Sequence, residues 1–144
     1  MTKNLIVDSG VIVKWVIEEH DTDLAVEVYQ SFQAGEFRML APDLVFAEFG
    51  NILWKKRTFE SLSDEDANAA IKIFREIPFV ITPSQSLFDS AMSLSIKHRR
   101  TFYDSLYLAL SMKEDSRFIT ADKRLYNAVN ATFPNIVLLS DWQG

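Results

Sequence analysis

Short, mostly apolar runs alternate along this sequence with longer segments that have the periodicity of helices. The apolar runs predict strands at residues 5–7, 37–40, 79–81, 117–120 and 136–139. Helices are predicted at residues 11–17, 23–34, 42–57, 63–76, 86–97, 102–113 and 122–131. Pro42 marks the start of the third helix, and the capping box Ser63-x-x-Asp66 opens the fourth.

Strands that are apolar on both faces are typical of a parallel sheet that helices cover from both sides. Together with the alternation of strands and helices, they predict a doubly wound α/β domain. The 144 residues contain no internal repeat, low-complexity tract or Pro/Gly-rich linker, so we expect one domain over residues 1–144. The hydrophobic fraction of 48% and the charged fraction of 24% are ordinary for a soluble globular protein.

The composition excludes several kinds of site. The chain has no cysteine, which excludes disulfides, thiolate chemistry and zinc sites built on sulfur. Two histidines, His20 and His98, are too few for a histidine-rich metal site. Neither a signal peptide nor a membrane-spanning run is predicted, and the absence of disulfides fits the cytoplasm.

The charge balance limits how the chain can meet nucleic acid. The net charge is -5 and the pI is about 5.0, which argues against broad electrostatic binding to a phosphate backbone. A local acidic site that reaches phosphates through bound cations remains compatible with this balance.

Acidic residues occur where the predicted strands end. Asp8 follows the first strand, and Asp122 lies two residues after the fourth. The second strand leads into the helix that carries Glu48, and Asp104 lies in the first turn of the helix at 102–113. Open parallel sheets bind ligands at the carboxyl ends of their strands. If the first and fourth strands are neighbours, these four carboxylates are expected to converge on one pocket.

Each acidic residue also has a structural explanation. Asp8 and Asp122 are well placed to cap the helices that they precede, and Asp104 can complete the capping box Thr101-x-x-Asp104. Glu48 is harder to explain in this way, because it lies at the edge of an apolar helical stripe and needs a partner when it is partly desolvated.

Taken together, the four carboxylates predict a cation site. Like charges in one cleft raise each other's pKa, and a bound divalent cation removes that conflict. Oxygen ligands without cysteine or clustered histidine favour a hard ion, Mg²⁺ or Mn²⁺. Four carboxylates can hold one or two such ions, as in two-metal phosphodiester chemistry.

Four stretches of the chain resemble the signature blocks of PIN-domain ribonucleases, most closely the VapC toxins of toxin–antitoxin pairs. These stretches are LIVDSGVIVKW, APDLVFAEFGNILW, TFYDSLYLALS and FITADKRL. They occur in the order and spacing of that family and cover almost the whole chain. The resemblance implies a three-layer α/β/α sandwich with a central parallel sheet in the strand order 3-2-1-4-5.

The resemblance also implies a set of functional residues. Asp8, Glu48, Asp104 and Asp122 correspond to the acidic quartet that binds Mg²⁺ or Mn²⁺. The first three are expected to bind one ion, and Asp122 to help a second ion or to orient the attacking water.

Hydroxyl side chains beside the quartet are expected to support it. Ser9 and Thr120 occupy such positions. Gly10 departs from the family, which commonly has Ser or Asn there, so one supporting hydrogen bond is in question.

The implied activity is that of an endoribonuclease with an RNA substrate. Its implied partners are a cognate antitoxin, which would place an arginine or lysine in the acidic pocket, and a second copy of the chain in a homodimer. Lys14, Arg99, Arg100 and Lys123 flank the acidic blocks and are candidates for contacts with the RNA backbone. Solvated helix ends explain any one of them equally well.

Three other side chains receive structural interpretations from the sequence. Lys56 lies in the basic end of a helix and is predicted to be solvated. Tyr107 is predicted to pack in the core. Trp54 is predicted to lie in the core or in an interface.

Other classes of protein fit the sequence less well. A haloacid-dehalogenase phosphatase needs a second aspartate at the position of Gly10. A receiver domain needs an acceptor aspartate after its third strand, where this chain has Thr82 and Pro83. A catalytically inactive PIN-like module that holds a basic partner in its acidic pocket remains the alternative to the nuclease.

Overall fold

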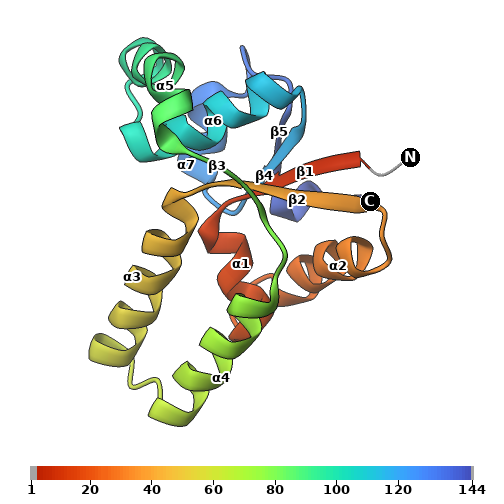
Figure 1. Ribbon diagram of the computed structural model, residues 1–144, viewed down its shortest axis with the longest axis vertical. Coiled ribbons are helices and arrows are strands. Elements are labelled where there is room, and N and C mark those ends of the chain that lie inside the picture. The colour runs from red at the N-terminus through yellow and green to blue at the C-terminus, as the bar shows by residue number, and fades with distance from the viewer. Residues whose placement is uncertain (1–2, 144) are drawn as a thin grey trace.

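The computed structural model describes residues 3–143, which form a five-stranded parallel sheet covered by helices on both faces (Figure 1). The strands are β1 (Lys3–Val7), β2 (Phe37–Pro42), β3 (Val80–Thr82), β4 (Arg117–Thr120) and β5 (Ile136–Leu138). Their order is β3-β2-β1-β4-β5, and each neighbouring pair is parallel. The predicted strand order is confirmed, and β1 and β4 are neighbours at the centre of the sheet.

Seven α-helices connect the strands in the described residues, and one short 3₁₀-helix follows the last strand. They are α1 (Ser9–Val16), α2 (Thr22–Gln33), α3 (Leu44–Phe59), α4 (Asp64–Glu76), α5 (Ser84–His98), α6 (Phe102–Glu114), α7 (Lys123–Val129) and η1 (Leu139–Asp141). The predicted cap of α4 is confirmed, since the Ser63 hydroxyl accepts a hydrogen bond from the Asp66 amide at 3.0 Å.

The start of α3 differs from the prediction. Pro42 does not begin the helix but ends β2, where it lies in register with Thr82 of β3. The Asp43 amide then donates to the Thr82 carbonyl at 3.1 Å, which extends the strand pairing by one residue. The helix therefore begins at Leu44.

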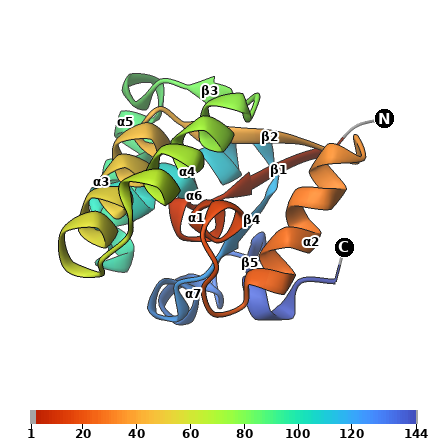
Figure 2. The ribbon, with the colours of Figure 1, turned by 90° about the horizontal axis from the view of Figure 1, so that it is seen from below.

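The buried side chains form two cores, one on each face of the sheet. Successive residues of a strand point to opposite faces. Leu5 and Val7 of β1 accordingly join the core beneath α1 to α4, whereas Ile6 joins the core beneath α5 to α7. Figures 1 and 2 show these two helical layers with the sheet between them. The structure thus confirms the predicted three-layer sandwich.

The α3–α4 hairpin extends away from the sheet (Figure 1). Phe49 of α3 and Phe74 of α4 stack with ring centroids 3.9 Å apart, and this contact closes the hairpin where it meets the core. Within residues 3–143, no helix combines the length and the apolar character that crossing a membrane requires.

Candidate active site

The four acidic residues predicted to converge line one pocket of about 470 Å³. β1 and β4 end side by side, and the residues that follow them, Asp8 and Asp122, reach the pocket from the sheet. Glu48 enters from the second turn of α3, and Asp104 from the first turn of α6. The convergence follows from the strand order, because β1 and β4 are parallel neighbours and their carboxyl ends lie at the same edge of the sheet.

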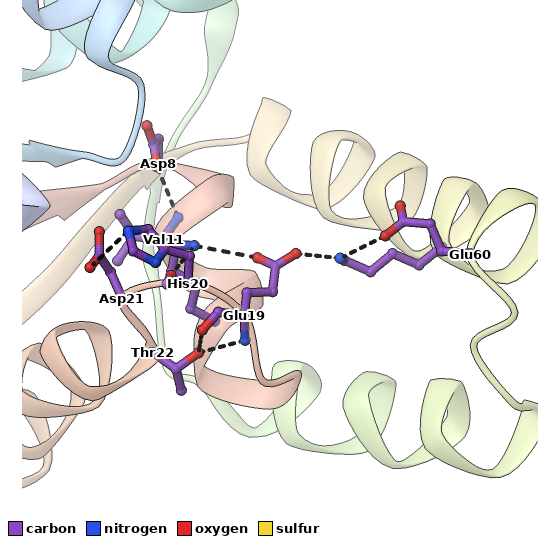
Figure 3. Close-up of polar contacts among 9 residues, drawn as sticks. Asp8, Val11, Glu19, His20, Asp21, Thr22 and Glu60 are labelled. Atoms are coloured by element: carbon purple, nitrogen blue, oxygen red, sulfur yellow. Dashed lines mark hydrogen bonds and ion pairs between the residues drawn. The ribbon is translucent and has the colours of Figure 1, made fainter.

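Asp8 caps α1 and lines the pocket at the same time. One carboxylate oxygen accepts a hydrogen bond from the Val11 amide at 3.0 Å (Figure 3). The other accepts from the Thr120 hydroxyl. The capping and pocket interpretations of this residue are therefore compatible, and both oxygens have a fixed orientation.

Thr120 connects the two strand ends. Its side chain is fully buried, and its hydroxyl accepts a hydrogen bond from the Asp122 amide at 3.0 Å while it donates to Asp8. Asp122 in turn caps α7 by accepting from the amides of Arg124 and Leu125, at 2.9 and 3.1 Å. One threonine thus fixes the relative positions of two carboxylates that are 114 positions apart in the sequence.

The partner of Glu48 is Tyr107, whose hydroxyl donates to the carboxylate at 2.6 Å. The Ser9 hydroxyl lies 3.4 Å from the same oxygen and donates to it more weakly. Tyr107 packs in the core, as predicted, with its ring stacked on Phe118. The hydrogen bond of Tyr107 to Glu48 was not predicted from the sequence. The available signal was a tyrosine in an otherwise aliphatic helical run, since a buried tyrosine hydroxyl normally requires a partner.

Asp104 lies in the first turn of α6, three residues after the N-cap Thr101. The Thr101 hydroxyl accepts from the Asp104 amide at 3.0 Å, which forms one half of the predicted capping box. Burial and the charge of Asp122 raise the pKa of Asp104, and the nearby Arg100 opposes this rise.

Burial is the main cause of the raised pKa values at the pocket. Burial raises the pKa of Asp8 from 3.8 to about 6, despite the hydrogen bonds from Thr120 and Val11. It also raises the pKa of Glu48, to which the charge of Asp104 adds, while the bonds from Tyr107 and Ser9 oppose the rise. The carboxylates are therefore crowded and partly desolvated, and a cation in the pocket would favour their ionised forms.

A family model for the PIN domain matches residues 5–130. The chain belongs to the PIN-domain family. Among curated proteins, it is similar to Ribonuclease VapC3 of Pyrobaculum aerophilum, with 28% identity over 123 residues that cover 84% of this chain and 91% of that protein. It is also similar to Ribonuclease VapC1 of Mycobacterium tuberculosis, with 35% identity over 89 residues that cover 59% and 63%.

Two solved structures share the PIN fold of this chain. PAE2754 from Pyrobaculum aerophilum superposes with a TM-score of 0.67 at 17% identity, covering 97% of this chain and 93% of that one. A toxin–antitoxin complex from Klebsiella pneumoniae superposes with a TM-score of 0.60 at 12% identity, covering 94% and 97%. At these identities the likeness concerns the fold.

The donor chemistry of this PIN-domain pocket fits a hard divalent cation. Within residues 3–143, no three acidic or histidine side chains are gathered closely enough to hold an ion by themselves. Mg²⁺ does not require such a cluster, because it is usually bound through one or two carboxylates and keeps several waters. The oriented carboxylate of Asp8 has free lone pairs beyond its two hydrogen bonds, so it can serve as such a ligand.

Ion pairs between lysine and glutamate also line the PIN-domain pocket. Lys14 of α1 and Lys56 of α3 both pair with the carboxylate of Glu19, which follows α1. Lys56 also pairs with Glu60, at 3.6 Å. The prediction that Lys56 is solvated is wrong, because its side chain turns inward to these two carboxylates and is buried.

The predicted RNA-contacting cations differ in position. Lys14 lines the pocket, whereas Arg99, Arg100 and Lys123 lie outside its lining in the described chain.

Burial lowers the pKa of Lys56, but the hydrogen bond to Glu19 and the charges of Glu19 and Glu60 outweigh this effect and raise the pKa. Lys56 is therefore a charged group within the pocket.

Proposed function

We propose that this PIN domain is a metal-dependent endoribonuclease and the toxin of a toxin–antitoxin pair. The observation that carries the proposal is the convergence of four carboxylates, from four separate segments of a PIN-family chain, on one partly desolvated pocket. The curated relatives named as ribonucleases support the same reaction. The chain acts in this proposal as a single PIN domain.

The four acidic residues have distinct roles in this proposal. Asp8, Glu48 and Asp104 would hold Mg²⁺ or Mn²⁺, in part through the waters that the ion keeps, since the three carboxylates do not form one tight cluster. Asp122 would help a second ion or orient the attacking water. A bound divalent cation lowers the pKa of water and stabilises negative charge on a phosphate.

The neighbouring side chains orient these ligands. Thr120 and the Val11 amide fix the Asp8 carboxylate, and Tyr107 and Ser9 fix that of Glu48. Preorganised ligands reduce the rearrangement needed at the reaction step.

Cations around the pocket position the substrate in this proposal. Lys14 lies in the pocket wall, and Arg99, Arg100 and Lys123 flank the acidic blocks outside it. Contacts of this kind hold a phosphate backbone in register without reading its sequence.

The proposed reaction is tested with purified protein and structured RNAs. We expect cleavage with Mg²⁺ or Mn²⁺, none with EDTA, and a loss of at least about 100-fold in Asp8→Asn. Asp23→Asn is a matched control, because Asp23 is an exposed aspartate in α2 outside the pocket lining. Cleavage that survives both chelation and Asp8→Asn would contradict the mechanism.

The inactive binding module is the second candidate, and the same acidic pocket supports it. Such a module would cleave no RNA with either metal, yet would still bind a basic partner. A partner that binds wild-type protein but not an Asp8→Asn, Glu48→Gln double variant, in the absence of any cleavage, would favour this alternative.

We propose that the antitoxin binds in the apolar groove between α3 and α4. The groove has a volume of about 860 Å³ and is lined by Phe46, Phe49 and Trp54 among others. Phe46 and Trp54 are about half exposed, so the groove presents a contiguous apolar surface of the kind that marks protein–protein interaction sites. An arginine or lysine of the same antitoxin would enter the acidic pocket.

We further propose that the chain forms a homodimer through α5. Phe88, Met92 and Ile96 recur every four residues along this helix and form an apolar stripe. Their exposed fractions are 51%, 39% and 73%. A second copy that packs the same stripe against this one would bury both.

A further inference from the structure

Part of the pocket lining is formed by a carboxylate that lies between two lysines. Glu19 Oε1 lies 3.5 Å from Lys14 Nζ, and Glu19 Oε2 accepts a hydrogen bond from Lys56 Nζ. The three side chains come from α1, from the connection between α1 and α2, and from α3. Figure 3 shows Glu19 at the centre of this chain of ion pairs, with Glu60 at its outer end.

Both lysines are unusually shielded from solvent for their residue type. The exposed fractions of the Lys14 and Lys56 side chains are 12% and 11%, whereas that of Glu19 is 26%. Lysine is rarely buried unless it is paired. Both lysines line the same pocket as the four catalytic candidates.

Each lysine retains hydrogen-bonding capacity toward the cavity. An ammonium group has three donors. Lys14 directs one to the His20 carbonyl at 2.6 Å and pairs with Glu19. Lys56 pairs with Glu19 and Glu60. Each group therefore has a donor left for an oxygen atom in the pocket.

The Glu19 carboxylate can leave its position without unfolding of the connection. Its main chain is held on both sides by Thr22, whose hydroxyl donates to the Glu19 carbonyl and accepts from the Glu19 amide, each at 2.6 Å. Rotation of the side chain alone would therefore separate the carboxylate from the two lysines.

We propose that Lys14 and Lys56 form a binding subsite for a phosphate of the RNA backbone, and that Glu19 occupies this subsite when no RNA is bound. The subsite rests on the proposed function, in which the acidic residues of the same pocket act on a neighbouring phosphodiester. A backbone phosphate has the charge and the oxygen ligands of the carboxylate that it replaces. Glu19 thereby lowers the affinity for RNA.

A purely structural role for these ion pairs predicts the opposite result. If Glu19 serves only to tie the α1–α2 connection to α3, its removal should loosen the pocket and leave RNA binding equal or weaker. If Glu19 competes with phosphate, its removal should strengthen binding even though the fold loses an ion pair.

The test measures binding of a fluorescently labelled single-stranded RNA by anisotropy, in EDTA, over a series of salt concentrations. We expect Glu19→Gln to bind about three- to tenfold more tightly than wild type, since a charge competing for the cations is removed. Lys14→Met and Lys56→Met should each bind more weakly and reduce the slope of log K against log salt by about 0.7, the value for one phosphate contact on a single strand.

Lys113→Gln is the matched control. Lys113 is an exposed lysine at the opposite end of α6 from Asp104, so this variant loses the same charge away from the pocket and should keep the wild-type slope. Thermal melting of each variant reports its folding. If Lys56→Met does not fold, Lys14→Met and Glu19→Gln still decide the result.

The subsite is overturned if Glu19→Gln binds no more tightly than wild type, if the lysine variants keep the wild-type slope, or if wild-type protein binds no RNA at low salt. The nuclease proposal is judged separately by metal-dependent cleavage. Cleavage with unchanged slopes refutes the subsite alone, whereas altered slopes without cleavage refute the nuclease alone.

Discussion

At the scale of single residues, Asp8 has two roles with opposite effects on the free energy of unfolding. As the N-cap of α1 it stabilises the helix, since its side chain accepts from the Val11 amide. As a partly desolvated carboxylate it opposes folding whenever it is ionised, because burial raises its pKa to about 6. Retaining such a carboxylate is understandable if a cation compensates its charge.

The cost of this charge should appear in the pH dependence of stability. The pKa of Asp8 is raised above 3.8, so the folded protein binds the proton more tightly than the unfolded chain between about pH 4 and 6. In EDTA, the free energy of unfolding should therefore fall as the pH rises through this range. Asp8→Asn should reduce this fall, leaving the part due to the raised pKa values of Glu48 and Asp104, and should stabilise the protein at about pH 8 by at most about 3 kcal/mol.

Urea denaturation at about pH 4 and pH 8 measures this effect. At the lower pH, the two proteins should have nearly equal stability because Asp8 is then largely protonated. Mg²⁺ should stabilise wild type more than Asp8→Asn at the higher pH. A variant that is less stable than wild type at both pH values would show that the cap outweighs the desolvation.

Tyr107 is the second residue whose role is local. Tyr107→Phe removes the donor to Glu48 and leaves the stacking on Phe118 in place. We expect kcat to fall about tenfold with little change in KM, because Tyr107 is buried and acts by orienting Glu48, which loses its hydrogen bond in this variant. Steady-state cleavage assays measure both constants.

Tyr103→Phe is the matched control, since Tyr103 lies on the same helix with an exposed fraction of 61%. Its kcat should equal that of wild type. Equal kcat values for Tyr107→Phe and wild type would mean that Ser9 alone suffices to orient Glu48.

At the scale of secondary structure, the strand ends place the site and the helix caps stabilise it. α1 and α7 begin directly at Asp8 and Asp122, so helix capping and the pocket depend on the same side chains. The cap of α4 is separate from the pocket, because Ser63 lies outside its lining among the described residues.

Ser63→Ala should therefore separate stability from activity. The loss of the hydrogen bond to the Asp66 amide should lower the free energy of unfolding by about 1 kcal/mol. The cleavage rate at a temperature well below the melting point should remain unchanged. A large loss of activity would instead indicate that the α3–α4 hairpin is coupled to the pocket.

At the scale of the whole molecule, two apolar surfaces lie on opposite helical layers. The α5 stripe belongs to the layer of α5 to α7, and the α3–α4 groove belongs to the other layer (Figures 1 and 2). A dimer partner and an antitoxin can therefore bind without competing for one face.

Ile96→Glu should convert the proposed dimer into a monomer, because it would place a charge in the proposed apolar contact at its most exposed residue. Light scattering coupled to size-exclusion chromatography measures the mass. Trp54→Glu is the crossed control, since it changes the other apolar surface and should leave the dimer intact. A wild-type protein that is monomeric at all concentrations would contradict the proposed dimer.

Most of the fold can be predicted from hydrophobic periodicity and from local capping signals. The mostly apolar runs at β1, β2 and β4, the Ser63 cap and the acidic residues after β1 and β4 can all be identified from neighbouring residues. These features were predictable because they depend on interactions between residues at most four positions apart. Pro42 was misassigned because its strand pairing with Thr82 is not local.

The sequence by itself determined the α/β class, the acidic residues of the pocket and the caps of the helices, because short-range periodicity and hydrogen bonding specify these features. Only the tertiary structure decided the partners of those residues. The bond from Tyr107 to Glu48 spans 59 residues, and that from Lys56 to Glu19 spans 37. Such contacts depend on how helices from different parts of the chain pack on the sheet, and side-chain burial follows from this packing rather than from residue type.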